Sequence, residues 1–268
     1  MIEDKQTTTI HEYLASNPNV DNTEIFDRFW AILSRIKEKV TQRFKVDRHP
    51  ACAGREYYQL PDGSFEGSLN AYSGPEVEWF VHSWIGNRKN SILDMNINIW
   101  LGPHIDVPHL VIVFGTVPKL FHYSDFIARR DLMTHPDYLK RYYEPAQPAW
   151  LGLRGNPNFQ WSVSHGAYMR AILSPVASSY TAERETSNID TLEAYVLDLF
   201  NRWLALVDAA PPVPESERAA LRARDHFLRE SIYRLDPMNA LAQKFLGPEL
   251  TETLVTIRYG KAQIEGTR

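Results

Sequence analysis

The residues best suited to chemistry are a histidine and an aspartate set among aliphatic and aromatic side chains. His109 opens the apolar segment HLVIVFG, and Asp125 closes the segment LFHYSD. Burial makes the charged form of each side chain costly, which lowers the pKa of a histidine and raises that of an aspartate. Because groups with shifted pKa values suit proton transfer, the pattern predicts a proton-transfer pair on adjacent strands. A core histidine and a capping aspartate are the alternatives that spacing leaves open.

A metal site is a second interpretation of the same region. His104, Asp106 and His109 form the pattern H-x-D-x-x-H, and these residue types are common metal ligands. On a continuous strand, however, residues 104 and 106 share one face while residue 109 points to the other. We therefore predict no metal ligands, although bends at Pro103 and Pro108 keep a metal-dependent enzyme open as an alternative.

The strand before His109 alternates polar and apolar residues. Asp94, Asn96, Asn98 and Trp100 fall on one face, and apolar residues fall on the other. Half-exposed antiparallel strands are common, so the alternation by itself favours a solvated outer face. The alternative is the floor of a pocket, where the amides and the carboxylate would bind a polar ligand.

Three further charged residues have two interpretations each. Arg129 and Arg130 are either surface charges or groups that hold carboxylates through bidentate hydrogen bonds. Asp236 precedes Pro237, where an aspartate is ordinary turn chemistry. The sequence contains no G-x-G-x-x-G, P-loop or G-x-S-x-G motif, so it shows neither a nucleotide fingerprint nor a hydrolase nucleophile elbow.

Composition restricts the class of protein. The 268 residues fit one large domain, and a hydrophobic content of 44% is ample for a core. A formal charge of -4 gives no sign of a nucleic-acid partner. The single cysteine, Cys52, excludes an internal disulfide and any cysteine-based zinc or iron–sulfur cage. The sequence has no run of about 18 apolar residues, so it predicts no transmembrane helix. The polar N-terminus predicts the bacterial cytoplasm, or the plastid stroma for a trimmed mature form; the oligomeric state stays open.

The hydrophobic period changes from helical to strand-like and back again. Helical spacing predicts a helix from Asn22 to Phe44. A period of two with short turns then predicts an antiparallel meander of six strands, with residues 107–114, apolar on both faces, at its centre. The expected strands are Arg55–Leu60, Ser64–Tyr72, Val77–Ile85, Ile92–Leu101, Val107–Phe114 and Lys119–Tyr123. The later helices are expected at Leu132–Tyr143, Gln160–Leu173, Leu192–Leu206, Glu215–Tyr233, Asn239–Phe245 and Pro248–Arg258.

This order of elements predicts an α/β protein. Helices that precede and follow the strands can cover both faces of one antiparallel sheet. The expectation is one domain over residues 1–268, in which residues 1–20 form a loosely ordered N-terminal segment.

Several segments resemble known pigment reductases. DFIARRDLMTHPDYLKRYYEP at 125–145, followed by YMRAILSPVAS at 168–178, resembles red chlorophyll catabolite reductase. IDVPHLVIVFG at 105–115, LFHYSD at 120–125 and LDPMNALAQKFLGPELTE at 235–252 resemble the related ferredoxin-dependent bilin reductases. The resemblance runs in the same order from about residue 67 to residue 259. It implies a three-layer α/β/α sandwich around a central antiparallel sheet of about six strands, with a linear tetrapyrrole between the sheet and the C-terminal helices.

The resemblance also implies roles for single residues. His109 matches the central-strand histidine beside the tetrapyrrole, Asp125 matches the carboxylate that protonates it, and Asp236 matches a second aspartate that contacts the substrate. Asn96 and Asn98 lie on the strand where several bilin reductases carry an acid, and an amide cannot replace an acid as proton donor. In the same setting, both arginines at 129–130 are candidates to hold the propionates of the pigment.

The activity implied is reduction of biliverdin or a related bilin by successive single-electron transfers, each coupled to protonation by buried Asp and His. Reduced [2Fe-2S] ferredoxin would supply the electrons, and no cofactor would be tightly bound. The alternatives are reduction of red chlorophyll catabolite and a non-catalytic bilin-binding protein. Which double bond is reduced, and whether by two or four electrons, stays open.

Overall fold

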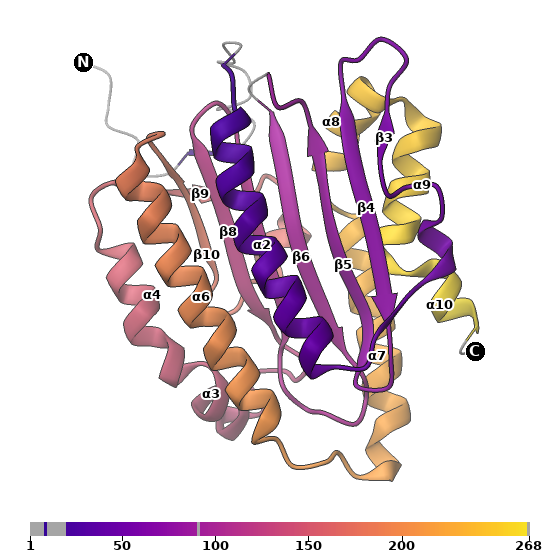
Figure 1. Ribbon diagram of the computed structural model, residues 1–268. Coiled ribbons are helices and arrows are strands. Elements are labelled where there is room, and N and C mark those ends of the chain that lie inside the picture. The colour runs from indigo at the N-terminus through magenta and orange to yellow at the C-terminus, as the bar shows by residue number, and fades with distance from the viewer. Residues whose placement is uncertain (1–7, 10–19, 90–91, 267–268) are drawn as a thin grey trace.

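The computed structural model describes residues 8–9, 20–89 and 92–266, and these residues build one large sheet between two layers of helices (Figure 1). Ten strands follow the order β1-β9-β10-β8-β7-β6-β5-β4-β2, with β3 paired to β4. All neighbouring strands are antiparallel except β1 and β9. The predicted α/β class and three-layer sandwich are confirmed, and the sheet is larger than predicted. The loosely ordered segment predicted at 1–20 lies outside the described residues except for residues 8, 9 and 20, and the single domain stays a prediction.

The elements have the following bounds. The strands are β1 (Thr8–Thr9), β2 (Asp47–Arg48), β3 (Tyr58–Gln59), β4 (Glu66–Ser73), β5 (Val77–Gly86), β6 (Leu93–Leu101), β7 (His109–Thr116), β8 (Leu120–Ile127), β9 (Phe159–Val163) and β10 (Ser178–Ala182). The helices are α2 (Thr23–Arg43), α3 (Pro136–Tyr142), α4 (Gln147–Arg154), α5 (Ala167–Ala171), α6 (Thr186–Asp208), α7 (Glu215–Arg234), α8 (Met238–Leu246), α9 (Pro248–Tyr259) and α10 (Lys261–Gly266), with 3-10 turns η1 (Pro50–Cys52) and η2 (Glu144–Ala146).

The predicted meander is the centre of the sheet. Strands β4 to β8 follow one another in sequence and in space, and β7 lies between β6 and β8. The strand predicted at 55–60 is reduced to the two residues of β3. Strand β8 continues beyond its predicted end to Ile127, so Asp125 lies within a strand and pairs with Val111 of β7.

Two strands beyond β8 were not predicted. The helix expected at 160–173 is wrong, because its first part belongs to β9 and only the five residues of α5 are helical. Trp161 of β9 pairs with Tyr180 of β10, and β10 pairs in turn with β8. Pairing along an existing sheet edge thus overrides the weak local preference of this segment.

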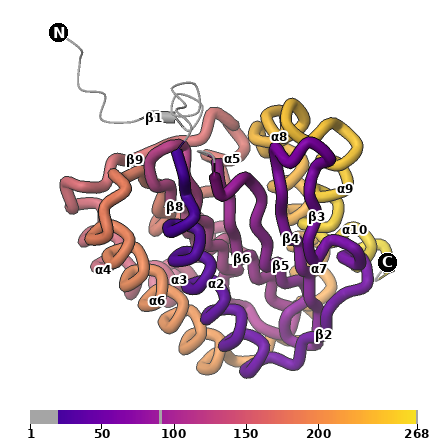
Figure 2. Tube along the Cα trace, turned by 45° about the horizontal axis from the view of Figure 1, so that its top comes forward, coloured from indigo at the N-terminus to yellow at the C-terminus, as the bar shows by residue number. Residues whose placement is uncertain are grey.

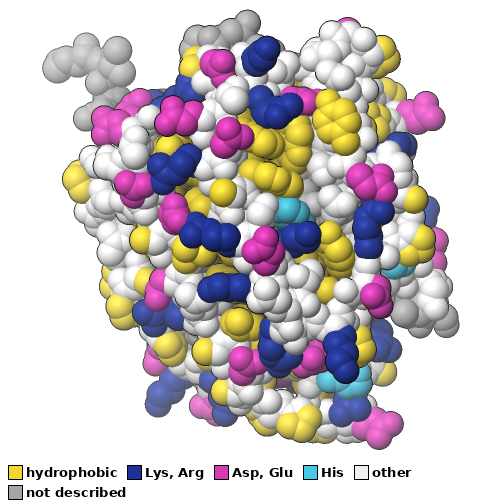
Figure 3. Space-filling model, in the orientation of Figure 1, with side chains coloured by type: hydrophobic (Ala, Val, Ile, Leu, Met, Phe, Trp, Pro, Cys, Tyr) yellow, Lys and Arg dark blue, Asp and Glu magenta, His cyan; other side chains and the backbone are white. Residues whose placement is uncertain are grey.

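The two faces of the sheet have different partners. Helices α2 and α6 lie side by side on one face (Figure 1), joined by ion pairs such as Arg28–Asp190 and Arg43–Asp208. Acidic and basic side chains are interspersed on that side of the molecule (Figure 3). The other face, which we call the inner face, packs Trp79, Val81 and Val111 against α7, α8 and α9. None of the described helices is long and apolar enough to cross a membrane.

Two glycines are expected to respond oppositely to alanine. Gly260 ends α9 with a φ of 72°, and an added Cβ would lie 2.8 Å from the Trp79 ring. Gly152 lies within α4, and its added Cβ would meet nothing within 4 Å. Gly260→Ala should therefore lower the free energy of unfolding by more than about 1 kcal/mol, whereas Gly152→Ala should raise it by about 0.5–1 kcal/mol. Urea unfolding of both variants checks this, and equal effects would contradict it.

Candidate active site

Asp125 is buried and tied to the chain that crosses over it. One carboxylate oxygen accepts the backbone N–H of Ser174 at 3.1 Å, and the other accepts the Ser174 hydroxyl. The Tyr123 hydroxyl donates to the same carboxylate at 3.3 Å. Burial raises the pKa of Asp125 to about 6, although these donors oppose the rise. A carboxyl group with this pKa can exist as an acid and as a base near neutral pH.

The segment that carries Ser174 closes the site from one side. It connects α5 to β10, and α5 lies at the same end of the sheet as α8 (Figure 2). A Cβ on Gly166 would lie 3.0 Å from the Pro237 ring, so the start of α5 touches the turn before α8. Asp125 is 1% exposed beneath its contacts with Ser174, so a ligand can reach its carboxyl only when covering residues move.

Asp236 and Tyr123 extend the polar site toward α8. Asp236 is half-buried, and its carboxylate accepts the Met238 N–H at 2.9 Å, which is the turn contact expected of an aspartate before proline. Burial raises the pKa of Asp236. Burial also raises the pKa of Tyr123, with further contributions from the charges of Asp125 and Asp236. Two carboxyl groups, each with a raised pKa, thus contribute to the raised pKa of one tyrosine.

Asn96 and Asn98 lie on the inner face and are buried, with exposed fractions of 1% and 7%. The solvated face that alternation favoured is therefore wrong for both, because α7 to α9 cover it. The Asn98 amide donates to Asn96 Oδ1 at 2.9 Å, as does the Ser83 hydroxyl at 3.0 Å. The Asn96 amide donates to Asp94 Oδ2 at 3.1 Å. The two amides are therefore buried and bonded to protein groups, and their contact with a ligand stays a prediction.

His109 does not face the same polar group as Asp125. Its Nδ1 accepts the backbone N–H of Leu101 at 3.0 Å, so the neutral ring carries its proton on Nε2. That Nε2 lies 3.1 Å from Asp225 Oδ1 on α7. Burial lowers the pKa of His109 to about 4, although Asp225 opposes the change. The histidine is therefore neutral at pH 7, with both nitrogens facing protein groups.

Asp225 is a site residue that the sequence patterns missed. Arg129 holds it with Nη2 at 2.5 Å and Nε at 3.3 Å, and donates also to Gly102 O at 3.2 Å and to Ile105 O. Burial raises the pKa of Asp225, and the contacts with His109 and Arg129 lower it further than burial raises it, to about 2. The sequence showed only that Leu221, Asp225 and Arg229 are spaced four apart and so share one face of α7; the structure shows that this face is buried.

The predicted binding of a propionate by Arg129 competes with the contacts that this arginine already makes to protein groups. Its side chain is fully buried and its donors already face protein oxygens. The propionate role of Arg129 stays a prediction, but its observed contacts join α7 to the chain around β7.

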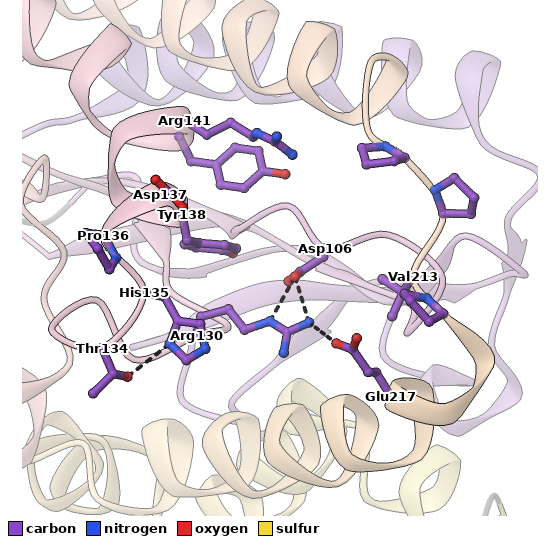
Figure 4. A pocket seen from close by; sticks show the side chains of 14 residues that line it. Asp106, Arg130, Thr134, His135, Pro136, Asp137, Tyr138, Arg141, Val213 and Glu217 are labelled. Carbon is purple, nitrogen blue, oxygen red and sulfur yellow. Dashed lines mark hydrogen bonds and ion pairs between the residues drawn. The ribbon is translucent and has the colours of Figure 1, made fainter.

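A cavity of about 530 Å³ is lined by Asp106 and Arg130 among others, and Asp125 does not line it. Arg130 enters the cavity and binds Asp106 and Glu217, both at 2.8 Å (Figure 4). His104 is exposed, and Asp106 and His109 are engaged with Arg130 and Asp225. The three residues of the possible metal motif therefore do not converge, and the described residues contain no group of three or more side chains placed to hold a metal.

Comparisons with known proteins show the family of this chain. The family model for red chlorophyll catabolite reductase matches residues 30–258. The red chlorophyll catabolite reductase of Hordeum vulgare is 24% identical over 65% of this chain and 90% of its own length. The chloroplastic enzyme of Arabidopsis thaliana is 27% identical over 74% of this chain and 68% of its own.

A solved structure shares the fold. Phytochromobilin synthase from tomato, crystallised in complex with biliverdin, matches 85% of this chain and 82% of its own with a TM-score of 0.73 and 16% identity. Together with the family match across most of the sequence, this likeness places the fold among pigment reductases. The chain belongs to the red chlorophyll catabolite reductase family.

Proposed function

We propose that this protein reduces an open-chain tetrapyrrole, biliverdin or a related bilin, on its inner face. The observation that carries the proposal is the buried Asp125 carboxyl, with a pKa of about 6, next to Tyr123. Support comes from the family match and from the fold shared with a biliverdin-bound enzyme. The family match also favours red chlorophyll catabolite as a second candidate pigment.

The electrons come from outside the chain. Reduction of one double bond consumes two electrons and two protons, and we assign the electrons to reduced [2Fe-2S] ferredoxin, one at a time. A cluster of this type needs several thiolates, whereas this chain has a single cysteine. The cluster therefore belongs to the partner, and the enzyme contributes pigment binding and proton delivery.

Asp125 is the proposed proton donor. Its protonated carboxyl transfers the O–H proton to the pigment after an electron arrives, which leaves a carboxylate. The Ser174 N–H, the Ser174 hydroxyl and the Tyr123 hydroxyl already point at that carboxylate and stabilise the charge. Asp236, which has a raised pKa, is the proposed second donor.

The pigment would lie between the sheet and α8, over the amides of Asn96 and Asn98. Contact with the Asp125 carboxyl requires displacement of the chain around Ser174, because Asp125 is buried beneath it. The Arg129–Asp225–His109 cluster would hold β7 and α7 in place. A proton relay through His109 requires one of its two contacts to break, and the relay stays a prediction.

An anaerobic absorbance assay tests the function. Biliverdin, ferredoxin, its reductase and NADPH are mixed with the protein, and red chlorophyll catabolite replaces biliverdin in a parallel reaction. The expected result is a pigment spectrum that changes with time and only when ferredoxin is present. A spectrum that shifts on binding and then stays constant would make the protein a pigment carrier.

The pH dependence of the reduction rate should follow the protonation of the Asp125 carboxyl. The acid form donates the proton, so the rate should fall as pH rises through the pKa, which is about 6 in the free protein. Ser174→Ala removes a donor that stabilises the carboxylate, so it should raise this pKa and move the falling limb to higher pH. Ser179→Ala, whose hydroxyl contacts Ser162, should leave the limb in place. If the rate of Ser174→Ala falls over the same pH range as that of the wild type, this hydrogen bond does not set the pKa of Asp125.

A further inference from the structure

The cavity of about 530 Å³ has walls from distant parts of the chain. Helix α3 forms one wall, and the connection between α6 and α7 forms another (Figure 4). The Val213 N–H donates to His104 O at 2.9 Å, which fixes this connection to the chain between β6 and β7. A volume of this size is typical of sites for small ligands. Because Asp125 does not line the cavity, the proposed reduction leaves it without a role.

Carboxylates outnumber guanidinium groups on one side of the cavity. Asp106 and Glu217 both bind Arg130 at 2.8 Å, so one positive charge faces two negative charges. The second oxygen of Asp106, Oδ1, is buried, and no described residue makes a hydrogen bond of good geometry with it. The side chain of Asp106 is 25% exposed, so a turn of its carboxyl group can bring this oxygen to the cavity. This side therefore suits a ligand with positively charged N–H donors.

The other side of the cavity carries an arginine without a carboxylate partner. Figure 4 shows Arg141 across the cavity from the Arg130–Glu217 pair. Arg141 is exposed, and its guanidinium carbon lies 6.0 Å from the centre of the Tyr142 ring. Within the described part of the chain no carboxylate forms an ion pair with it, and this includes Asp137, one turn earlier on α3. A free guanidinium can bind a carboxylate through two parallel hydrogen bonds.

Aromatic rings and prolines form the walls between the two charged sides. The rings of Tyr138 and Tyr142 lie edge to face, with their centres 4.6 Å apart. Tyr138 is 8% exposed, and its buried hydroxyl has no hydrogen bond of good geometry with a described residue. Pro211, Pro212 and Pro214 line the wall formed by the connection between α6 and α7. These walls suit an apolar side chain, and the rings also attract a cation.

We propose that this cavity binds a free α-amino acid with an apolar side chain. The ammonium lies against Asp106 and Glu217, the carboxylate lies against Arg141, and the side chain packs on the tyrosines and prolines. An ammonium has three N–H donors, so it can contact both carboxylates at once. The terminus of a peptide carries only one of the two charges, so a free amino acid matches the cavity better. The site is separate from the one that holds Asp125 and does not depend on pigment reduction.

Calorimetric titration with three matched compounds tests the proposal. L-Phenylalanine carries both charges, phenethylamine lacks the carboxylate, and phenylpropionate lacks the ammonium. The wild-type protein should bind phenylalanine about 10- to 100-fold more tightly than either analogue, because each analogue loses one hydrogen-bonded charge. Arg141→Met should bind phenylalanine no more tightly than phenethylamine and should keep the wild-type affinity for phenethylamine. Arg154→Met is the matched control and should behave like the wild type, since Arg154 also lies 6.0 Å from a ring centre, that of Trp161, but does not line the cavity.

A second variant removes the opposite charge. Asp106→Asn should lose phenylalanine and phenethylamine together, and phenylalanine should raise the Tm of the wild type but not that of this variant. No heat with millimolar phenylalanine, an analogue bound as tightly as phenylalanine, or a preference that persists in Arg141→Met would each overturn the proposal. Wild-type affinity for phenylalanine in Asp106→Asn would overturn it as well. Biliverdin reduction is decided separately, because neither Asp125 nor Asp236 lines the cavity.

Discussion

Asp125→Asn should bind biliverdin and reduce it about 10²- to 10⁴-fold more slowly than the wild type, since this is the usual contribution of a positioned general acid. The amide has the shape of the carboxyl and can keep the contact with the Ser174 N–H. It has no acidic proton to give. The comparison needs pigment binding by absorbance titration and initial rates of reduction with ferredoxin in excess.

The same variant separates catalysis from folding. Burial disfavours the Asp125 carboxylate, as its raised pKa shows, so a neutral amide at this position should not lower stability at pH 7. Asp198→Asn is the matched control, because Asp198 lies on the surface of α6 beside Arg202. Wild-type turnover by Asp125→Asn would remove Asp125 from the mechanism.

Asp225→Asn should have the largest effect on stability, a loss of about 3–5 kcal/mol in the free energy of unfolding. It leaves the fully buried Arg129 guanidinium without its carboxylate. Glu217→Gln is the control on the same helix, because it removes a partner of the partly exposed Arg130 and should cost at most about 1 kcal/mol. Urea unfolding at pH 7 measures both.

The buried ion pair predicts two further results. Replacing both partners, as Asp225→Leu with Arg129→Met, should recover much of the stability lost by either single change. The pKa of Asp225 is lowered from 3.8 to about 2, so its contribution is present above about pH 4 and is lost as pH falls toward 2. Asp225→Asn should lack this part of the acid sensitivity. A loss below about 1 kcal/mol in the variant would show that the pair does not hold α7.

Local sequence patterns were sufficient to predict the helices and strands with strong hydrophobic periodicity. The apolar stripe of α2, which includes Phe29, Ile36 and Val40, predicted its helix to within one residue at each end. The central meander was predicted because its turns and its alternation agree. Strands β9 and β10 were not predicted, because β10 forms by pairing with β8 and β9 by pairing with β10, and such pairing is not a property of their own residues.

The candidate site could be predicted only where burial follows from the local sequence. His109 and Asp125 are buried as expected, because aliphatic neighbours surround them on central strands. Asn96 and Asn98 are covered by helices more than a hundred positions later in the chain. The alternation of polar and apolar residues therefore wrongly predicted a solvated face. Asp225 was missed for the same reason, because its partner His109 lies on a strand more than a hundred positions earlier.

The most direct test of the central claim is a single turnover of biliverdin with stoichiometric reduced ferredoxin, followed by chromatography and mass spectrometry of the pigment. The account predicts a product that has gained hydrogen, formed by the wild-type protein and almost absent with Asp125→Asn. Pigment recovered unchanged from the wild-type protein, with ferredoxin reoxidised no faster than without protein, would contradict it.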